Sequence, residues 1–230
     1  MVSDLSILEK KIEVKFKNKD LLKQALTHRS YLNENTETGM SDNERLEFLG
    51  DAVLELIVTD HLYKTYKNPE GELTSWRASL VNADRLSAIT KEIDLNGFLM
   101  LSRGESKDTG KARDVILANA IEAIIGAIYL DQGLDVVSKF IEKFIIVHLL
   151  EIIEKKLYID SKSLFQEKAQ EFFSTTPHYE VISEKGPDHK KRFVVGVYIE
   201  AELISKGEGS SKQEAQQVAA EKALEAKGWK

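Results

Sequence analysis

The sequence predicts two domains, an all-α N-terminal domain followed by a small α+β domain with the element order helix, three strands, helix. The prediction rests on the spacing of the apolar residues. From the start of the chain to about residue 155 they recur every three or four positions, as on one face of a helix. After residue 160 they alternate within short segments, as in strands, before a last helix rich in Ala, Gln and Glu. We place the domains at residues 1–156 and 160–230.

Composition limits the classes of protein and the kinds of site. The chain has 230 residues, enough for one or two domains that each bury a core. It has no cysteine, which excludes disulfides, thiolate metal sites and cysteine nucleophiles. No apolar run approaches the roughly 18 residues of a membrane span, and the first residues do not read as a secretory signal. We therefore expect a cytoplasmic protein without a membrane segment.

The net charge of −6 is unusual for a protein that binds nucleic acid. It divides into −5 before residue 160 and −1 from residue 160 onward, so neither predicted domain is basic. Any surface that binds phosphate must therefore be local, built from a few clustered cations.

Turn and capping signals delimit the first helices. Residues 18–20 are expected to form a turn into a helix start. His28 follows an apolar face and is expected to make a hydrogen bond at a helix end, because no second His within four residues completes a zinc pair. One of residues 41–43 is expected to cap a helix that continues to about Tyr66.

Three more helices are expected in this domain. After a turn at residues 68–72 they cover residues 73–88, 115–131 and 135–156. The polar, glycine-containing loop at residues 102–111 lacks the spacing of a phosphate-binding P-loop.

The helix after residue 43 carries three carboxylates on one face, because Glu44, Glu47 and Asp51 stand at positions i, i+3 and i+7. Taken alone, such a face is most often a solvated surface. Gly50, in the middle of the same helix, costs about 1 kcal/mol relative to Ala, which indicates a close backbone approach at that position.

A second polar pair stands inside a strongly apolar helix. Asn119 and Glu122 share one face of the helix at residues 115–131. A buried acid must be paired, hydrogen-bonded or bound to a metal. If the two helices pack face to face, Glu47 and Asp51 join Asn119 and Glu122 in an oxygen-rich cluster. Such a cluster suits Mg²⁺ or Mn²⁺ rather than zinc.

Residues 43–54, with the sequence NERLEFLGDAVL, resemble the signature of the ribonuclease III family. The resemblance extends from residues 24–30 to the C-terminus. It implies a double-stranded-RNA-specific endoribonuclease with an endonuclease domain and a double-stranded RNA-binding domain. Its products would carry 5′-phosphate and 3′-hydroxyl ends with short 3′ overhangs. Its substrates would be ribosomal RNA, messenger RNA and other structured precursor transcripts.

The resemblance also assigns roles to the acidic residues. Glu47, Asp51 and Glu122 would bind Mg²⁺, which Mn²⁺ can replace, and no small-molecule cofactor is implied. Asp51 and Glu122 would be catalytic, with Glu44 and Glu70 assisting near the scissile phosphate. We favour Glu70 over the acid two residues later, because it directly precedes Gly in the family's pattern. The family also implies a homodimer with one site per subunit and Phe48 near the dimer contact.

One residue departs from the family's pattern, which usually has Asp where this chain has Asn119. An Asn keeps a carbonyl oxygen for ligation but brings no charge. Our hypothesis is that Asn119 is a tolerated metal ligand and that the enzyme requires more metal as a result.

The second predicted domain resembles a double-stranded RNA-binding domain with three recognition patches in the expected order. Such domains read the shape of A-form RNA over about 16 base pairs, and a helix N-terminus with a lysine favours phosphate. The predicted patches are Gln166, Glu167 and Gln170 on the first helix, Pro187 and His189 in a turn between strands, and Ser211, Lys212 and Gln213 at the start of the last helix.

Each patch alone is more often an ordinary cap, turn or solvated helix, and it is the three in order that favour RNA binding. Gln213 stands where the family commonly has another lysine. Residues 190–192, two lysines and an arginine, are expected to supply some of the missing charge.

Two other interpretations remain open at this point. A double-stranded RNA-binding protein that has lost catalysis is supported by Asn119 and opposed by Glu122 and the Glu47–Asp51 pair. A purely helical dimerisation scaffold leaves the second domain unexplained. Salt-dependent binding of duplex RNA distinguishes the scaffold from the other two.

Overall fold

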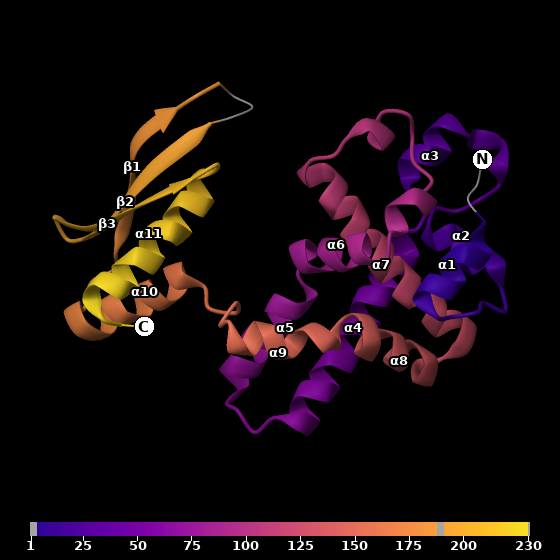
Figure 1. Cartoon of the computed structure of the whole chain (residues 1–230), viewed down its shortest axis with the longest axis horizontal. Coiled ribbons are helices and arrows are strands. Elements are labelled where there is room, and N and C mark those ends of the chain that lie inside the picture. The colour runs from indigo at the N-terminus through magenta and orange to yellow at the C-terminus, as the bar shows by residue number, and fades with distance from the viewer. Residues whose placement is uncertain (1–3, 188–190, 230) are drawn as a thin grey trace. The chain divides into compact units, whose positions relative to one another are not determined.

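Two compact units make up the chain, one over residues 1–158 and one over residues 159–230 (Figure 1). The structure is a computed structural model and describes residues 4–187 and 191–229. Within these residues every strand assigned to a sheet belongs to the second unit. No helix in the same residues is long and apolar enough to cross a membrane. The predicted order, an all-α domain and then a small α+β domain, is confirmed.

Side-chain caps start the first three helices, α1 (Leu5–Ile12), α2 (Lys19–Ala25) and α3 (Arg29–Glu34). Asn18 accepts a hydrogen bond from the backbone N–H of Asp20, which confirms the predicted turn. His28 caps α3, its Nδ1 accepting from the backbone N–H of Ser30 at 3.3 Å. Burial lowers the pKa of His28, so the ring stays available as an acceptor. The predicted helix-end role of His28 is confirmed.

The signature helix α4 (Glu44–Thr65) begins after an anchored residue. The buried Asn43 donates its backbone N–H to the carbonyl of Thr27 at 2.9 Å and its side-chain amide to the carbonyl of Ala25 at 3.3 Å. Asp42 accepts from the backbone N–H of Glu44 at 3.2 Å. The start of α4 is therefore capped by Asp42 and tied to the preceding segment by Asn43.

The predicted helix over residues 73–88 is wrong, because two helices occupy this region, α5 (Glu70–Val81) and α6 (Ala83–Glu92). Asn82 between them is extended, with ψ of 158°, and its side chain accepts from the backbone N–H of Arg85 at 2.9 Å. An Asn in this position is a typical N-cap, so α6 starts anew.

The predicted helix over residues 135–156 is also wrong. The chain forms α8 (Leu134–Phe144), a 3₁₀ turn at Ile146–His148 and α9 (Leu149–Glu154). The helix ends at Ile145, where φ is −119°. Ile145 and Ile146 are both buried in the core, so the break places two consecutive apolar side chains inside the domain.

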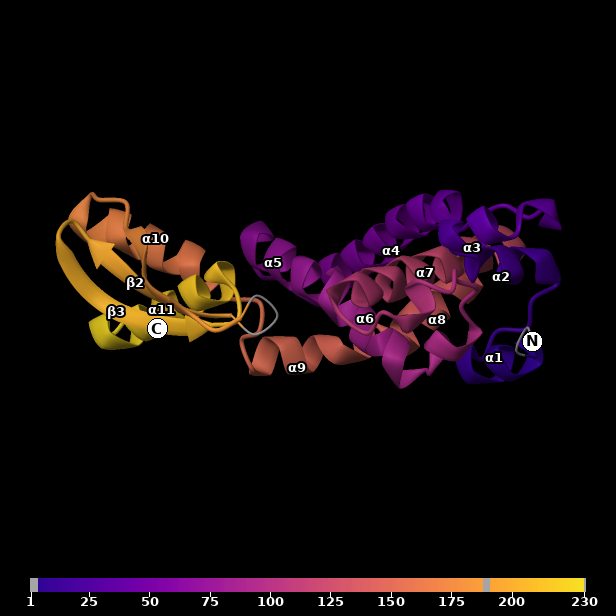
Figure 2. The same ribbon diagram turned by 90° about the horizontal axis from the view of Figure 1, so that it is seen from above.

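The central helix of the first unit is α7 (Lys111–Gln132), which packs against α2, α4, α6 and α8. Figure 2 shows α4 and α7 running side by side.

Aspartate side chains tie both ends of α7 to neighbouring segments. Asp114 accepts from the Ser87 hydroxyl at 2.8 Å, and Asp131 accepts from the backbone N–H groups of Lys17 and Asn18, each at 2.8 Å. The remaining short elements are 3₁₀ turns at Thr36–Thr38, Leu95–Phe98 and Glu105–Lys107.

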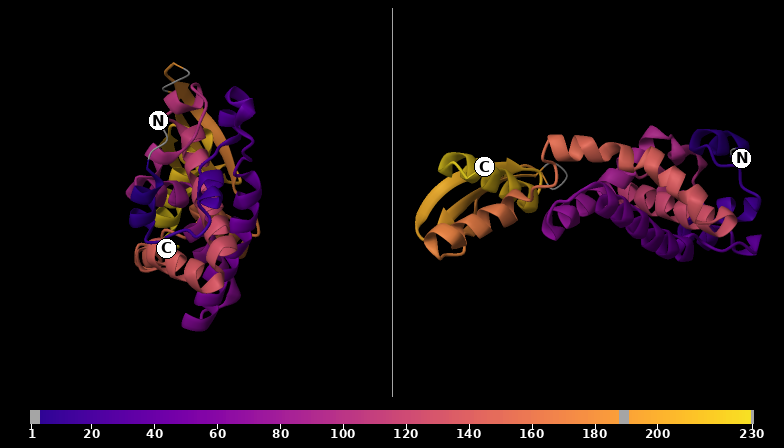
Figure 3. Two further views of the ribbon diagram at one scale, coloured as in Figure 1. Left: turned by 90° about the vertical axis from the view of Figure 1, so that its right-hand side faces the viewer. Right: turned by 90° about the horizontal axis from the view of Figure 1, so that it is seen from below.

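The second unit is an antiparallel sheet with two helices, and Figure 3 gives further views of it. In order, the elements are α10 (Ser161–Phe173), β1 (His178–Lys185), β2 (Arg192–Ile199), β3 (Glu202–Gly209) and α11 (Lys212–Lys227). The strand order is β1-β2-β3. Phe165 of α10 and Val197 of β2 share one buried core with Ala219, Ala220 and Ala223 of α11. All five predicted elements of this unit are confirmed.

Candidate active site and RNA interface

Two glycines bring α4 and α7 into direct backbone contact. A Cβ added at Gly50 would lie 1.8 Å from the carbonyl oxygen of Glu122. A Cβ added at Gly126 would lie 2.2 Å from the carbonyl oxygen of Leu46. The close approach predicted for Gly50 is confirmed, and its partner is the backbone of the second polar helix. Gly126 was not predicted, although a glycine inside an apolar helix, one turn after an acid, is a usable signal.

This contact brings the predicted acidic residues together. Burial is the main cause that raises the pKa of Glu122, to about 7, and the charges of Asp51 and Glu47 raise it further. Burial and the charges of Glu44 and Asp51 raise the pKa of Glu47, while a hydrogen bond from Asn119 lowers it. The four predicted ligands, Glu47, Asp51, Asn119 and Glu122, therefore interact with one another across the α4–α7 interface.

The donor set suits a hard divalent cation. Its ligand atoms are carboxylate and amide oxygens, which Mg²⁺ and Mn²⁺ prefer, and its like charges repel without a countercharge. In residues 4–187 and 191–229 no three His, Cys, Asp or Glu side chains are grouped closely enough to hold a metal ion in their present conformations. The side chain of Asn119 is engaged with Glu47. The chemistry of the residues thus fits a cation, and their side chains would have to converge to bind it.

The two acids predicted to assist differ in whether their charges act on this cluster. Glu44 is exposed at the start of α4, where Arg29 forms an ion pair with it at 3.4 Å, and its charge acts on Glu47. Glu70 starts α5, accepts a hydrogen bond from the Thr74 hydroxyl at 2.9 Å and is not among the charges that act on Glu47 or Glu122. The structure therefore brings Glu44 to the cluster and leaves Glu70 apart from it.

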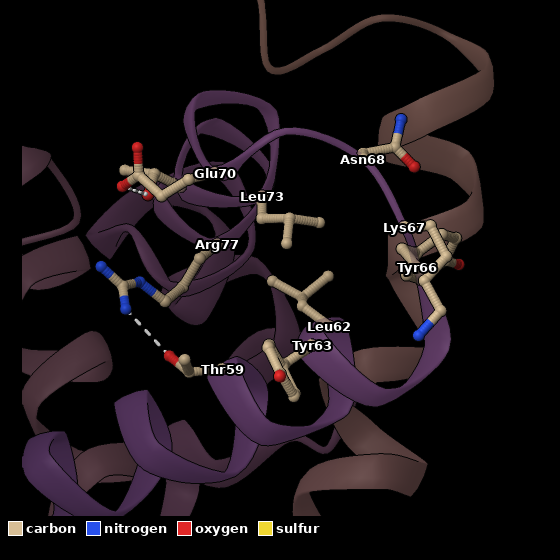
Figure 4. A pocket seen from close by; sticks show the side chains of 10 residues that line it. Thr59, Leu62, Tyr63, Tyr66, Lys67, Asn68, Glu70, Leu73 and Arg77 are labelled. Atoms are coloured by element: carbon tan, nitrogen blue, oxygen red, sulfur yellow. Dashed lines mark hydrogen bonds between the residues drawn. The ribbon is translucent and has the colours of Figure 1, made fainter.

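Glu70 instead lines a pocket of about 570 Å³ between the C-terminal part of α4 and the start of α5. Arg77 donates to the Thr59 hydroxyl at 2.8 Å and pairs with Glu55 at 2.9 Å. Figure 4 shows the Arg77 guanidinium on the same side of the pocket as Glu70. The lining residues are Thr59, Leu62, Tyr63, Tyr66, Lys67, Asn68, Glu70, Leu73, Thr74 and Arg77.

The predicted helix patch of the second unit forms a continuous surface. Gln166, Glu167 and Gln170 are exposed on α10 and line one shallow hollow of about 440 Å³ together with Ser163 and Glu171. Long polar side chains on one exposed helix face are suited to the 2′-hydroxyls and base edges of a minor groove.

The start of α11 combines a side-chain cap with an exposed lysine, and the Glu214 carboxylate accepts from the backbone N–H of Ser210 at 2.7 Å. The Ser211 hydroxyl caps the helix by accepting from the backbone N–H of Glu214 at 3.1 Å. The Lys212 ammonium lies 5.9 Å from the centre of the Phe193 ring, and Gln213 is exposed next to it. A capped N-terminus with a lysine favours phosphate.

The predicted turn between strands is described only in part. Pro187 is exposed directly after Gly186, whose φ is 99°. His189 and Lys190 lie outside the described residues. Lys191 pairs with Glu184 at 2.7 Å.

Comparisons with known proteins agree with both units. Residues 18–149 match the family described as ribonuclease-III-like, and residues 161–227 match the double-stranded RNA binding motif. Ribonuclease 3 of Borreliella afzelii is 45% identical over 225 residues, which cover 97% of this chain and 91% of that protein. Ribonuclease 3 of Oceanobacillus iheyensis is 43% identical over 226 residues, covering 96% of this chain and 97% of that one.

A solved structure supports the fold of the first unit. The nuclease domain of ribonuclease III from Campylobacter jejuni, described for flexibility in a region involved in dimer formation, aligns with a TM-score of 0.55 at 39% identity. The alignment covers 61% of this chain and 95% of that domain.

A helical nuclease domain with a carboxylate cluster, followed by a double-stranded RNA-binding domain, defines an endoribonuclease that acts on duplex RNA. The chain belongs to the ribonuclease III family.

Glu122 leads to a prediction for the metal-free protein. Its pKa of about 7 in the folded state exceeds its ordinary value of 4.5, so the folded chain holds this proton more tightly than the unfolded chain. Protonated Glu122 therefore contributes fully to the free energy of unfolding at a pH below its ordinary pKa of 4.5. This contribution is lost as the pH rises through about 7. We expect the unfolding midpoint of the first unit in EDTA to decrease between pH 5.5 and pH 8, measured by thermal denaturation.

The matched variant is Glu122→Gln, which imitates the neutral form. Its unfolding midpoint should decrease less over the same pH range, and at pH 8 the variant should be the more stable protein. An identical decrease in the wild type and the variant would contradict the assignment.

Proposed function

We propose that this chain is a cytoplasmic, Mg²⁺-dependent enzyme that hydrolyses phosphodiester bonds in double-stranded RNA, leaving 5′-phosphate and 3′-hydroxyl ends with short 3′ overhangs. Its substrates are ribosomal RNA, messenger RNA and other structured precursor transcripts. The observation that carries the proposal is the cluster of mutually repelling carboxylates across the α4–α7 contact, in a chain that also has an RNA-binding domain. Mn²⁺ substitutes for Mg²⁺.

Three carboxylates hold the cation in this proposal. Glu47 and Asp51 approach it from α4 and Glu122 from α7, and the raised pKa values of Glu47 and Glu122 reflect negative charge that a cation would balance. When bound, the cation polarises a phosphoryl oxygen and lowers the pKa of water. Glu44, held by Arg29, orients groups near the scissile phosphate.

An exposed apolar stripe on α4 supports a homodimer. Phe48, Leu56 and Tyr63 expose 81%, 59% and 75% of their surface, and their spacing places them on one side of the helix. Contiguous exposed apolar side chains mark association surfaces. We infer that two copies pair along this stripe, with Phe48 at the contact and one active site in each subunit.

A dimer also gives Glu70 a role. Its pocket includes Thr59 of α4, which follows Asp51 by eight residues, or about 12 Å of helix. Glu70 is not among the charges that act on Glu47 or Glu122 of its own chain, so we infer that it assists the site of the other subunit. A two-fold dimer with antiparallel α4 helices directs the Glu70 of one subunit toward the carboxylates of the other.

The second unit binds the duplex through its three patches. The α10 surface and the segment with Pro187 and His189 contact two minor grooves. The α11 start, with Ser211, Lys212 and Gln213, contacts the phosphates between them. Because the chain has a net charge of −6, these few local groups carry the electrostatic part of binding.

The first test is cleavage of a long, perfect RNA duplex with and without Mg²⁺. The wild type should cut the duplex into short products only with metal. Glu122→Gln should lose at least about 100-fold in rate, because a ligand of the cation is removed. Glu142→Gln, which alters an exposed acid on α8, should cut like the wild type.

Gel analysis of the products, with determination of their ends, is the measurement. Tight binding by the wild type without cutting, even in excess Mn²⁺, would refute the proposed activity and favour a binding protein that has lost catalysis.

Asn119 provides a second prediction. Replacing its neutral amide by a carboxylate in Asn119→Asp adds a charge to the cation site, so the Mg²⁺ concentration for half-maximal cleavage should fall by about 10-fold. A titration of the cleavage rate with Mg²⁺ measures it, with Asn119→Ala as the control that raises the requirement. An unchanged magnesium dependence in Asn119→Asp would exclude Asn119 as a ligand.

The start of α11 provides a third prediction. Lys212→Ala should weaken binding of duplex RNA equally for different sequences and reduce the slope of log Kd against log salt by about 1, because one phosphate contact is lost. Fluorescence anisotropy at several salt concentrations measures this slope. Lys222→Ala, an exposed lysine further along the same helix, is the matched control and should leave the slope unchanged. Equal slopes for Lys212→Ala and the wild type would remove Lys212 from the interface.

A further inference from the structure

The contact between α4 and α7 is tightest beside the proposed cation ligands. Gly50 directly precedes Asp51, and the atom that a Cβ at Gly50 would meet is the carbonyl oxygen of Glu122 itself. On the other side, a Cβ at Gly126 would lie 2.2 Å from the carbonyl oxygen of Leu46 and 3.1 Å from the backbone nitrogen of Gly50. Leu46 directly precedes Glu47.

Neither overlap can be relieved by turning a side chain, because the atoms met first belong to the backbones of two long helices. Other buried positions of α7 behave differently. Ala120, Ala123 and Ala127 each carry a Cβ at 0% exposure, so α7 accommodates small side chains elsewhere in the core. In α4 and α7, the positions that require glycine, Gly50 and Gly126, lie within about one helical turn of the proposed carboxylate ligands.

We infer that Gly50 and Gly126 are positioning residues whose backbone contact sets the separation between the carboxylates of α4 and Glu122 of α7. This inference rests on the proposed function, because it concerns the geometry of the proposed cation site. Ligands of a metal site must be held to within about 0.5 Å, whereas a methyl group at either glycine forces the helices apart by more than that. Neither glycine has a side chain that could bind the cation, and both face backbone atoms of the opposite helix.

The main test is the affinity of the full chain for Mn²⁺, measured without RNA from the electron paramagnetic resonance signal of free Mn²⁺. Gly126→Ala should raise the Kd by at least about 10-fold, because Glu122 moves away from Glu47 and Asp51. Ile125→Val is the matched control. It removes a methyl group from the same buried turn of α7, leaves the glycine contact intact and should keep the wild-type Kd. Circular dichroism confirms that each variant is folded.

A longer carboxylate distinguishes a positioning role from a general loss of packing. In the wild type, Asp51→Glu should weaken Mn²⁺ binding, because the extra methylene does not fit a fixed spacing. In the Gly126→Ala background the same change should restore part of the affinity, because the longer side chain spans the wider gap. Asp51 is exposed, so Asp51→Glu alone tests the fixed spacing even if Gly126→Ala does not fold.

The outcomes separate the two proposals. Wild-type protein that binds no Mn²⁺, or Glu122→Gln that binds it equally well, would overturn the proposed cation site. Wild-type binding that is unchanged in Gly126→Ala, or unchanged in Asp51→Glu alone, would overturn only the positioning role. If the glycines position the carboxylates, Asp51→Glu weakens Mn²⁺ binding in the wild type and strengthens it in Gly126→Ala.

Discussion

The contact between the backbones of α4 and α7 is the constraint on which the rest of the active site depends. Gly50 and Gly126 allow the two helices to approach without an intervening side chain. The residues next to these glycines are then brought close together, which is why the charges of Asp51 and Glu47 raise the pKa of Glu122, more than 70 positions away in the sequence. The apolar faces of both helices bury the surrounding core, and the polar residues occupy the part of the interface that remains partly open to solvent.

The same arrangement places carboxylates that repel one another inside a stable domain. Without a counterion, burial and neighbouring charges oppose ionisation of Glu47 and Glu122. The cost is offset by the continuous apolar core that extends from Leu8 of α1 to Ile152 of α9. Like charges that destabilise a packed domain are expected mainly at functional sites, where the function requires them. The hydrogen bond from Asn119 is a partial remedy that an aspartate in its place would not provide.

Most of the fold could be predicted from the sequence, because it depends on local patterns, and so could the polar residues that α4 and α7 bring together. Apolar spacing located the long helices, and strand alternation located the sheet. The break at Asn82 has a local signal, since Asn is a common helix cap, but the apolar pattern continues across it. The break at Ile145 has no comparable signal, because it is decided by burial of two isoleucines in the tertiary core.

The site was predictable only as far as residue spacing is informative. Shared helix faces identify the acids, yet spacing cannot show that Asn119 is engaged with Glu47 or that Glu70 lines a separate pocket. Both facts depend on side-chain conformation and on how α5 packs on α4.

The aspartates at the two ends of α7 carry a consequence for the choice of ion. Asp114 bonds to α6 near the start of the helix, and Asp131 bonds to the chain before α2 near its end. A helix restrained at both ends resists the shift that a larger ion would require. Mg²⁺ needs oxygens at about 2.0–2.1 Å and Ca²⁺ at about 2.3–2.6 Å, and a rigid frame discriminates between such radii better than a flexible one. In the proposed cation site, two hydrogen-bonded aspartates that are not ligands would therefore contribute to discrimination by ionic size.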